Sequence, residues 1–497
     1  MGSRRAKPGS ARQLPPVTDG KAIGSGRTWS GLRFARKRVR GTTAGALALR
    51  LVDSLKALIA RHPLAAVLAG GLVLRLLLAG LPGFGSDLAY FRDWAEMIAA
   101  RGPEDFYASE GFHNYAPSYM FVLWLFGDLD EILGFSDFQW AYLLKLPPIL
   151  ADLGSACVLY LLLSGRTLAR PFGAVALYLV FPPVLLIGAV WGQVDSILAF
   201  LILLTIYLLD RDRPVAGVIA FTVAALLKPQ AVAALPFLIF WVVRDHPTAW
   251  TSIRSVRLPL PPRLWWRMIA ASIGSALLLA FPFFPSLLPW RPLSDLVGQV
   301  RTAVAEFDSL NSFYAFNIWD LMGIAGGCDV SVCTNATTGD VTNGGEFLGL
   351  TNRSWGLLLF ALSAAAVIVV LRRARGVGFL ALGTSLCVLA FYVFMTRMHE
   401  RYLFPFFLPF LVACVLLRSR ALWWTFGVLA VVHFLNLYYV YTREDGNLRV
   451  QTAYDWIEKA DLLGTGLGTT QFLSAIVVGG FFVLTALAHR LVSNQPR

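Results

Sequence analysis

Charged residues are scarce in this chain of 497 residues, where Asp, Glu, Lys and Arg make up 15% of the total. An average soluble domain carries about 25%. Hydrophobic residues make up 57%, and the mean hydropathy is +0.62. This composition excludes a disordered chain and argues against an ordinary soluble enzyme. The glycine-rich nucleotide patterns and the Gly-x-Ser-x-Gly pattern are also missing from any suitable context, so ATP-driven and serine-hydrolase chemistry lose support.

Excess positive charge is missing from all but one region. The formal net charge is +13, but residues 1–62 hold fourteen Lys and Arg residues against only Asp19 and Asp53. The other 435 residues carry 29 basic and 28 acidic side chains. We therefore predict a basic cytoplasmic arm over 1–62 that is largely disordered, because it has few large apolar residues. This arm would contact anionic lipid head groups rather than nucleic acid, and residues 491–497 would form a tail.

Long apolar runs fill the remainder, and a bilayer core needs about 20 such residues in a helix. The sequence therefore predicts an all-α fold, a polytopic transmembrane bundle of about 12 to 13 helices over 63–490 with extracytoplasmic loops. The run 215–243 is too long for one span and is interrupted by Lys228 and Pro229, which favours two short spans or a broken helix. The expected segments are 64–80, 117–134, 141–164, 171–190, 194–209, 215–243, 268–288, 355–371, 377–396, 402–417, 421–440 and 471–490.

The loops differ in charge, and the Lys and Arg content of short loops sets membrane orientation. The basic clusters, expected in the cytoplasm, are Arg166 and Arg170, Arg211 and Arg213, Arg244 to Arg267, Arg372 to Arg375, and Arg418 and Arg420. The acidic loops, expected outside, are 81–116, 190–196, 289–354 and 441–470. The loop 127–140 is acidic yet would be cytoplasmic. Either the segment 117–134 is re-entrant or the charge rule fails there.

The five cysteines fall into two groups. Cys157, Cys387 and Cys414 lie in apolar runs and are read as small apolar residues. Cys328 and Cys333 lie in the long outer loop 289–354, where their spacing suits either a disulfide in an oxidising compartment or two free thiols. The bias toward Ala, Arg and Leu indicates a bacterial chain, for which we expect a location in the plasma membrane.

The first candidate site group follows the first apolar run. Asp87 stands at its outer end, where it can face a lipid-borne substrate and take a proton from an acceptor hydroxyl as a general base. The alternative is that Ser86 or Asp87 only caps a short interfacial helix. The neighbouring residues expected to bind acceptor or sugar are Tyr90, Asp93, Trp94 and Tyr115.

The second group is the segment 191–196, between two long apolar runs. Gln193 and Asp195 offer fixed hydrogen-bond geometry and could hold sugar hydroxyls. The alternative is that one of them satisfies the free backbone donors of a helix start.

The third group lies at the break in 215–243. Lys228, with Gln230 two residues later, would hold an anion such as a lipid phosphate. The alternative is a lysine that extends to the nearer membrane surface.

The fourth group lies between two apolar runs on the predicted outer side, where other turns are acidic. Arg397, His399, Glu400 and Arg401 could form a phosphate or diphosphate site, with Arg401 suited to bidentate contact. The His-Glu-x-x-His zinc pattern is absent, and the sequence leaves open whether a divalent metal is used.

With these groups in order, the chain resembles the GT-C class of integral-membrane glycosyltransferases, and among them bacterial relatives of the mannosyltransferase that adds the second mannose of GPI anchors. The likeness spans about residues 64–440, and Ala116 departs from it where proline is more usual. The residues that carry it are Asp87-x-x-Tyr90-x-x-Asp93-Trp94, Tyr115 to Tyr119, Gly192 to Ser196, Leu227 to Gln230 and His399 to Pro405.

This resemblance implies an inverting transfer of a hexose, usually mannose or glucose, from a polyprenyl-phosphate donor on the extracytoplasmic side. Asp87 would assist the acceptor, and basic residues would hold the lipid phosphate. The acceptor would be a glycolipid, a polysaccharide or a protein. A transporter or lipid flippase would also have many spans, polar residues in the membrane and a broken helix. Against it, no internal repeat is apparent, and the polar groups lie mainly at outer loop boundaries.

Overall fold

The chain is described from a computed structural model, in which 1–66 and 67–497 are separate units. The described residues are 61–109, 111–166, 170–245, 251–253, 256–258, 262–288, 290–305, 311–324, 346–444, 448–461 and 467–495. Of the arm predicted over 1–62, all but the last two residues lie outside these ranges, as do Cys328 and Cys333.

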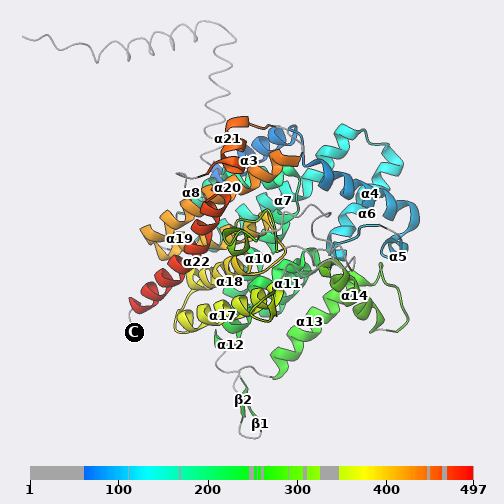
Figure 1. The fold of residues 1–497 in the computed structure, drawn as a ribbon. Helices are drawn as coiled ribbons and strands as arrows, with labels where there is room; N and C mark the ends of the chain where they lie inside the picture. The colour runs from blue at the N-terminus through cyan, green and yellow to red at the C-terminus, as the bar shows by residue number, and fades with distance from the viewer. Residues whose placement is uncertain are drawn as a thin grey trace, which may run out of the picture. The chain divides into compact units, whose positions relative to one another are not determined.

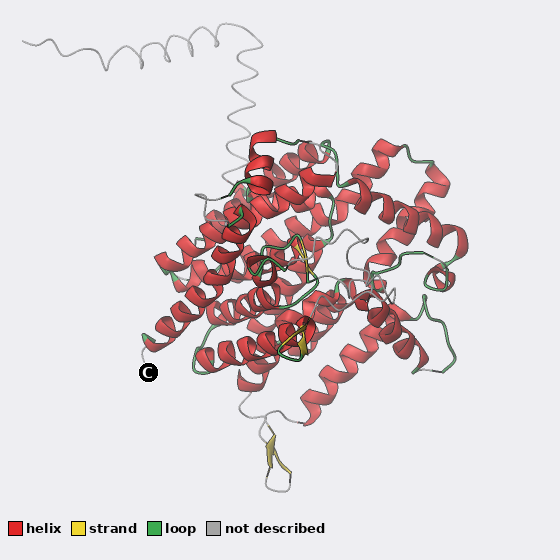
Figure 2. Cartoon of the chain, viewed as in Figure 1, coloured by secondary structure: helices red, strands yellow, loops and turns green. Residues whose placement is uncertain are grey.

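Helices make up almost all of the described structure, so the predicted all-α class is confirmed (Figures 1 and 2). The helices are α3 (Pro63–Ala79), α4 (Gly85–Arg101), α5 (Pro103–Phe106), α6 (Pro117–Leu133), α7 (Asp137–Leu163), α8 (Pro171–Leu179), α9 (Pro182–Val184), η1 (Leu185–Trp191), α10 (Asp195–Asp210), α11 (Pro214–Leu227), η2 (Pro229–Ala234), α12 (Leu235–Asp245), α13 (Pro262–Ala280), α14 (Arg291–Ala305), α15 (Ile318–Leu321), α17 (Asn352–Leu371), α18 (Val377–Phe394), η4 (Glu400–Leu403), α19 (Phe404–Leu417), α20 (Arg420–Glu444), α21 (Gln451–Lys459) and α22 (Thr469–Ser493).

The strands are short and form three two-stranded sheets within the described ranges. Two of these are antiparallel, and each pairs two segments that are close together in the chain. The third is parallel and joins segments far apart in sequence. The pairs are β1 (Thr251–Ile253) with β2 (Val256–Leu258), β4 (Glu346–Phe347) with β5 (Leu350–Thr351), and β3 (Ser312–Phe313) with β6 (Met398–His399).

Each apolar run expected from the sequence coincides with a helix or a helix pair. Several begin at a proline, which fits the first turn because its missing N–H has no partner there in any helix. The largest offset is in the run 268–288, where α13 begins at Pro262 and ends at Ala280. The predicted break at Lys228 is confirmed, because α11 ends at Leu227 and a 3₁₀ segment, η2, follows before α12.

Among the described residues, six helices are long and apolar enough to cross a membrane, which makes the chain a multi-span membrane protein. They are Asp137–Leu163, Asn352–Leu371, Val377–Phe394, Glu400–Leu417, Arg420–Arg443 and Thr469–Ser493. The pair formed by α8 with α9 and η1, bent by 48°, would be a seventh. Three shorter apolar helices, Pro63–Ala79, Pro214–Leu227 and Pro229–Arg244, do not reach that length, so the count of 12 or 13 spans stays a prediction.

Helix α18 lies at the centre of the bundle, since 94% of its apolar window is buried, against 22% for the adjacent α17. It contacts α12, α17, α19 and α22 (Figure 1). The loops predicted to be cytoplasmic meet at the helix ends: Arg166 pairs with Asp210 at 2.6 Å, and Arg244 donates to the Leu371 carbonyl at 3.4 Å. These contacts agree with a common side for the basic loops.

The acidic segment 127–140 is helical rather than a loop. Helix α6 ends at Leu133, and α7 begins at Asp137 behind a capping box formed by Ser136 and Gln139. Helix α6 is not among the helices that qualify as spans, and it packs closely along α4, because Gly127 leaves room for the Ala95 carbonyl. The segment 81–116, expected as an outer loop, contains a helix, α4, that packs along α6.

Candidate functional site

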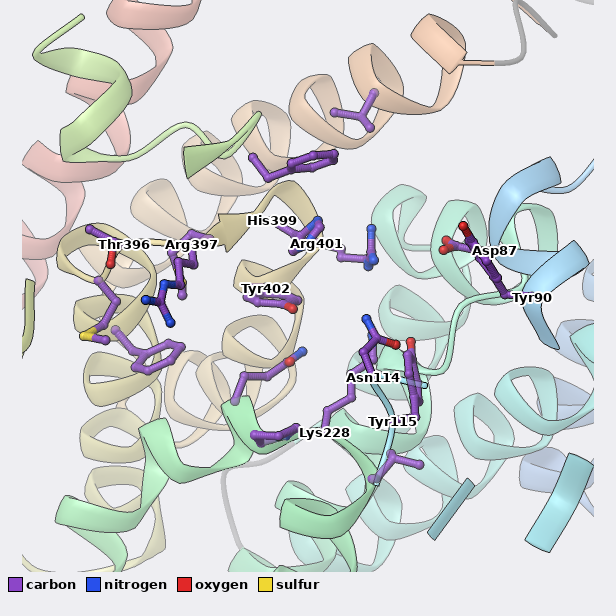
Figure 3. A pocket seen from close by; sticks show the side chains of 18 of the residues that line it. Asp87, Tyr90, Asn114, Tyr115, Lys228, Thr396, Arg397, His399, Arg401 and Tyr402 are labelled. Carbon is purple, nitrogen blue, oxygen red and sulfur yellow. The ribbon is translucent and has the colours of Figure 1, made fainter. Parts of the chain in front are cut away.

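Three of the four sequence groups line a cavity of about 600 Å³, and the remaining group, 191–196, lies behind its wall (Figure 3). Its walls come from the first turns of α4, the segment before α6, the break between α11 and η2, the connection from α18 to α19, and the start of α17. Figure 3 shows Asp87 and Tyr90 on one side and Arg397, His399 and Arg401 on the other. Segments over 300 residues apart in sequence thus form one site.

Asp87 lies in the first turn of α4 but does not cap it. The N-cap is Phe84, and no side-chain cap is present. Instead, the Asp87 Oδ2 accepts hydrogen bonds from the Trp191 indole and from the Gln193 amide, each at 2.7 Å. The Oδ1 atom receives no hydrogen bond from any described residue. Asp87 therefore has one oxygen fixed by the protein and one available to a ligand in the cavity.

The two residues that donate to Asp87 lie at the end of an unusual helix and just after it. Residues Leu185–Trp191 form a π-helix, a form often found at functional sites. It ends at Gly192, whose φ of +89° suits glycine. A Cβ there would lie 2.9 Å from the end of the Leu88 side chain, which would have to shift, so the positive φ is the stronger reason for glycine at this position.

Gln193 and Asp195 lie behind the cavity wall rather than on it, with 1% and 0% exposure. Neither caps α10 by its side chain, since the N-cap is Val194 and has no such bond. The Gln193 Oε1 does accept from its neighbour, the Val194 N–H, at 3.1 Å. Their buried positions therefore do not favour the predicted role, which is direct binding of sugar hydroxyls.

Lys228 is buried and turned inward, not extended to a membrane surface. Its Nζ donates to Asp195 Oδ2 at 2.8 Å and to Gln193 Oε1 at 3.1 Å, and it still lines the cavity. Gln230 also reaches Asp195, at 3.2 Å. The anion expected beside Lys228 is thus supplied in part by Asp195.

The connection from α18 to α19 presents the largest basic part of the wall. Arg397 has a φ of +64°, which is uncommon for a residue with a side chain, and its N–H donates to the Asn311 carbonyl at 2.9 Å. The β3–β6 pairing holds this turn in place. Arg401 donates to Glu400 at 2.9 Å and lies 3.9 Å from Asp195.

The charges on the cavity wall are unequal. Asp87 is the acidic residue among those that line it, whereas four lining residues are basic. The basic residues are Lys228, Arg353, Arg397 and Arg401. Asp195 and Glu400 balance part of this charge from behind, but a ligand in the cavity faces mainly cations. Such a surface suits an anionic group such as a phosphate.

Two uncharged ionisable groups complete the polar wall. Burial lowers the pKa of His399 well below its usual value, and the positive charges of Arg401 and Lys228 act in the same direction. Burial also raises the pKa of Tyr115, whose hydroxyl donates to Gln193 at 3.2 Å. Both side chains are therefore neutral near pH 7 and act through hydrogen bonds and ring contacts.

The structure brings together most of the residues expected from the sequence. The nine that line the cavity are Asp87, Tyr90, Trp94, Tyr115, Lys228, Gln230, Arg397, His399 and Arg401. Gln193, Asp195 and Glu400 are buried and bonded to members of that set. Asp93 is exposed on another face of α4 and does not line the cavity, so its position gives no support to its predicted role in acceptor or sugar binding.

Sequence reasoning missed Arg353 and the bond from Trp191 to Asp87. Arg353 lies in the first turn of α17, and a lone basic residue at the outer end of an apolar helix could have indicated it. No comparable signal exists for an indole N–H.

Two further observations complete the description of the site. In the part of the chain that is described, no group of three His, Cys, Asp or Glu side chains is arranged to hold a metal ion. A comparison of the sequence with known protein families and with curated proteins finds no significant match.

Proposed function

We propose that this chain is a membrane glycosyltransferase that transfers a hexose, with mannose the first candidate, from a polyprenyl-phosphate donor to an acceptor outside the cytoplasm. One observation carries the proposal. The Asp87 carboxylate, whose Oδ1 accepts no hydrogen bond from a described residue, lies across a single cavity from Arg397 and Arg401, at the ends of apolar helices. A displacement at a lipid-linked sugar needs a base on one side and cations on the other.

The chemistry follows from that arrangement. Asp87 Oδ1 accepts the proton of an acceptor hydroxyl while the oxygen of that hydroxyl attacks the anomeric carbon of the donor sugar. A new glycosidic bond forms, the bond from that carbon to the phosphate oxygen breaks, and the configuration inverts. The lipid phosphate leaves with the electron pair as an anion, stabilised by Arg401 and Lys228, so no acid is needed. Asp87 then returns its proton to solvent.

The apolar part of the wall suits the rest of a lipid donor. Leu227, Val232 and Leu357 line the cavity beside Phe391 and Met395. Val232 is 46% exposed and Leu357 49% exposed, which places this apolar wall at the surface of η2 and α17. A prenyl chain could thus lie against membrane-facing helices while its phosphate meets the cations. The aromatic wall near Tyr90 and Trp94 suits stacking on a sugar ring.

The test uses the purified full chain in nanodiscs. Radiolabelled mannose or glucose is presented on undecaprenyl or dolichyl phosphate, together with glycolipid, polysaccharide and peptide acceptors. We expect label to move from at least one donor to an acceptor, with the inverted anomeric configuration. If no label leaves any donor while labelled lipid crosses the bilayer of proteoliposomes, the chain is a flippase or transporter and the proposal fails.

A further inference from the structure

The Gln193 side chain is fully engaged although it does not touch the cavity. Its Nε2 donates to Asp87 Oδ2 at 2.7 Å, and its Oε1 accepts from Tyr115, Lys228 and the Val194 N–H at 3.1 to 3.2 Å. Gln193 is 1% exposed. A side chain in this position does not reach a sugar in the cavity, but it contacts the proposed base, Asp87, and also Lys228, which is proposed to bind the donor phosphate.

We propose that Trp191 and Gln193 form a clamp that positions the Asp87 carboxylate for proton transfer, with Lys228 fixing the orientation of the Gln193 amide. This inference rests on the proposed function and deepens it. Trp191 and Gln193 are positioning residues in this scheme, because they act through Asp87. The scheme gives Lys228 a second role beside its contact with the cavity.

The orientation of the Gln193 amide is determined by its neighbours. The ammonium of Lys228 and the backbone N–H of Val194 can only donate hydrogen bonds. The amide oxygen must therefore face them, and the NH₂ group must face Asp87. A flipped amide would set an acceptor against the Asp87 carboxylate and a donor against an ammonium group. Lys228 thus holds the donor toward Asp87 without touching it.

Trp191 is equally constrained. Its ring stacks on Phe84 with centroids 4.4 Å apart, and its carbonyl accepts from the Phe84 N–H at 3.2 Å. Phe84 is the residue that precedes α4. The ring stacking and the backbone hydrogen bond therefore connect Trp191 to the residue just before the helix that carries Asp87. Gly192, between the two clamp residues, lies close to Leu88 of that helix.

Both clamp bonds end on Oδ2, and Oδ1, which accepts no hydrogen bond from a described residue, remains for the proton transfer. Without them the carboxylate can rotate about its side-chain torsions, and proton transfer depends steeply on such geometry. Substrate binding should change little, because Gln193 lies outside the cavity. The clamp therefore predicts a loss in kcat rather than a rise in KM.

The experiment compares Gln193→Met, Gln193→Glu and Trp191→Phe with Gln230→Met, a glutamine that lines the cavity and bonds to Asp195 instead. We expect Gln193→Met to lower kcat by about 10- to 100-fold with both KM values within threefold, since misplacement of a reacting group has costs of that order. Trp191→Phe should lower kcat less. Gln230→Met should show the opposite split, with a raised donor KM.

Gln193→Glu separates the clamp from a purely structural role. A glutamate has the same shape and still accepts from Tyr115 and Lys228, but it sets a second carboxylate against Asp87. We expect its kcat to fall at least as far as that of Gln193→Met. Wild-type kcat in Gln193→Glu, or a KM effect without a kcat effect in Gln193→Met, would overturn the clamp.

The clamp can also fail independently of the proposed function. If wild-type protein is active and the Gln193 variants match it, only the clamp is rejected. If wild-type protein transfers no sugar from any donor, the function is rejected, and electron cryomicroscopy of Gln193→Met decides the clamp. An Asp87 side chain that keeps its position in that variant would overturn it, and a rotated one would support it.

Discussion

Two clusters of buried charge lie in the same helical unit, and they differ in what surrounds them. In the first, Arg75 of α3 donates to Asp152 of α7 at 2.9 Å, with both side chains at 0% exposure. Arg75 also donates to the Leu179 carbonyl, and Tyr178 donates to Asp152. Cation and anion are matched one to one, and neither residue lines the 600 Å³ cavity.

The second cluster joins Asp87, Asp195 and Glu400 with Lys228 and Arg401, and part of it faces that cavity. A buried charge is retained only if something compensates it. In the Arg75–Asp152 pair, called the closed pair below, the two charges compensate each other away from the cavity, which indicates a role in packing. In the second cluster, called the open cluster below, only Asp87, Lys228 and Arg401 line the wall, while Asp195 and Glu400 lie behind it. With Arg353 and Arg397 added, the described wall carries four cations and one acid, which indicates a role toward an anionic ligand.

The largest expected effect concerns the acid of the open cluster. Asp87→Asn keeps the shape but cannot accept a proton, so we expect transfer to fall by about 10³-fold or more, since general base catalysis contributes up to about 10⁴-fold. The melting temperature in detergent should stay close to that of wild type. Transfer of labelled sugar measures the loss. Asp93→Asn, on the same helix but outside the cavity, is the control and should remain active, and an active Asp87→Asn would reject Asp87 as the base.

The second prediction concerns the closed pair. Arg75→Met or Asp152→Leu alone leaves an uncompensated buried charge and should destabilise the protein by about 3 to 5 kcal/mol. Replacement of both residues should restore most of the melting temperature and leave transfer intact. The matched double variant in the open cluster, Lys228→Met with Asp195→Leu, should also be more stable than either of its single variants, but it should not regain transfer. If the Arg75 and Asp152 double variant folds yet is inactive, the closed pair has a role beyond packing.

The comparison also shows what the sequence could predict. The helices follow from long apolar runs, and all twelve expected segments correspond to helices, although only six of these helices are long and apolar enough to cross a membrane. The convergence of Asp87, Lys228 and Arg401 agrees with the predicted sidedness of the loops, because their segments were expected at the outer ends of helices. Neither result requires knowledge of side-chain contacts.

The errors have a physical reason as well. Helix α4 carries several charged residues and has no long apolar run, so the apolar pattern predicts a loop over 81–116 rather than a helix. Once it is a helix, Tyr90 and Trp94 share a face with Asp87, at spacings of three and seven residues. Asp93, six residues on, points elsewhere. The Arg75–Asp152 pair and the clamp on Asp87 depend on tertiary hydrogen bonds, for which residue spacing gives no signal.

The third prediction tests the cations of the open cluster. Lys228→Ala and Arg401→Ala should raise the donor KM about 10- to 100-fold, as expected for losing a charge-assisted contact of about 1.5 to 3 kcal/mol, and should raise the acceptor KM less. Steady-state transfer at varied donor and acceptor concentrations measures both. Arg92→Ala is the control, because Arg92 pairs with Glu96 and Asp137 at an exposed position. Equal increases in both KM values would indicate that these cations only hold the structure.

The smallest effect concerns the neutral member of the open cluster. His399 packs against Phe313 and Tyr402, and burial together with Arg401 and Lys228 lowers its pKa in the folded protein. Below about pH 6.5 the unfolded chain binds a proton at this residue that the folded chain does not, so stability is lost as the pH falls, by up to about 1.4 kcal/mol per pH unit. His399→Phe keeps the ring contacts and removes that proton. Its melting temperature should therefore fall less than that of wild type between pH 7 and pH 5, and an identical fall in both proteins would show that burial and the neighbouring cations do not hold His399 neutral in the folded protein.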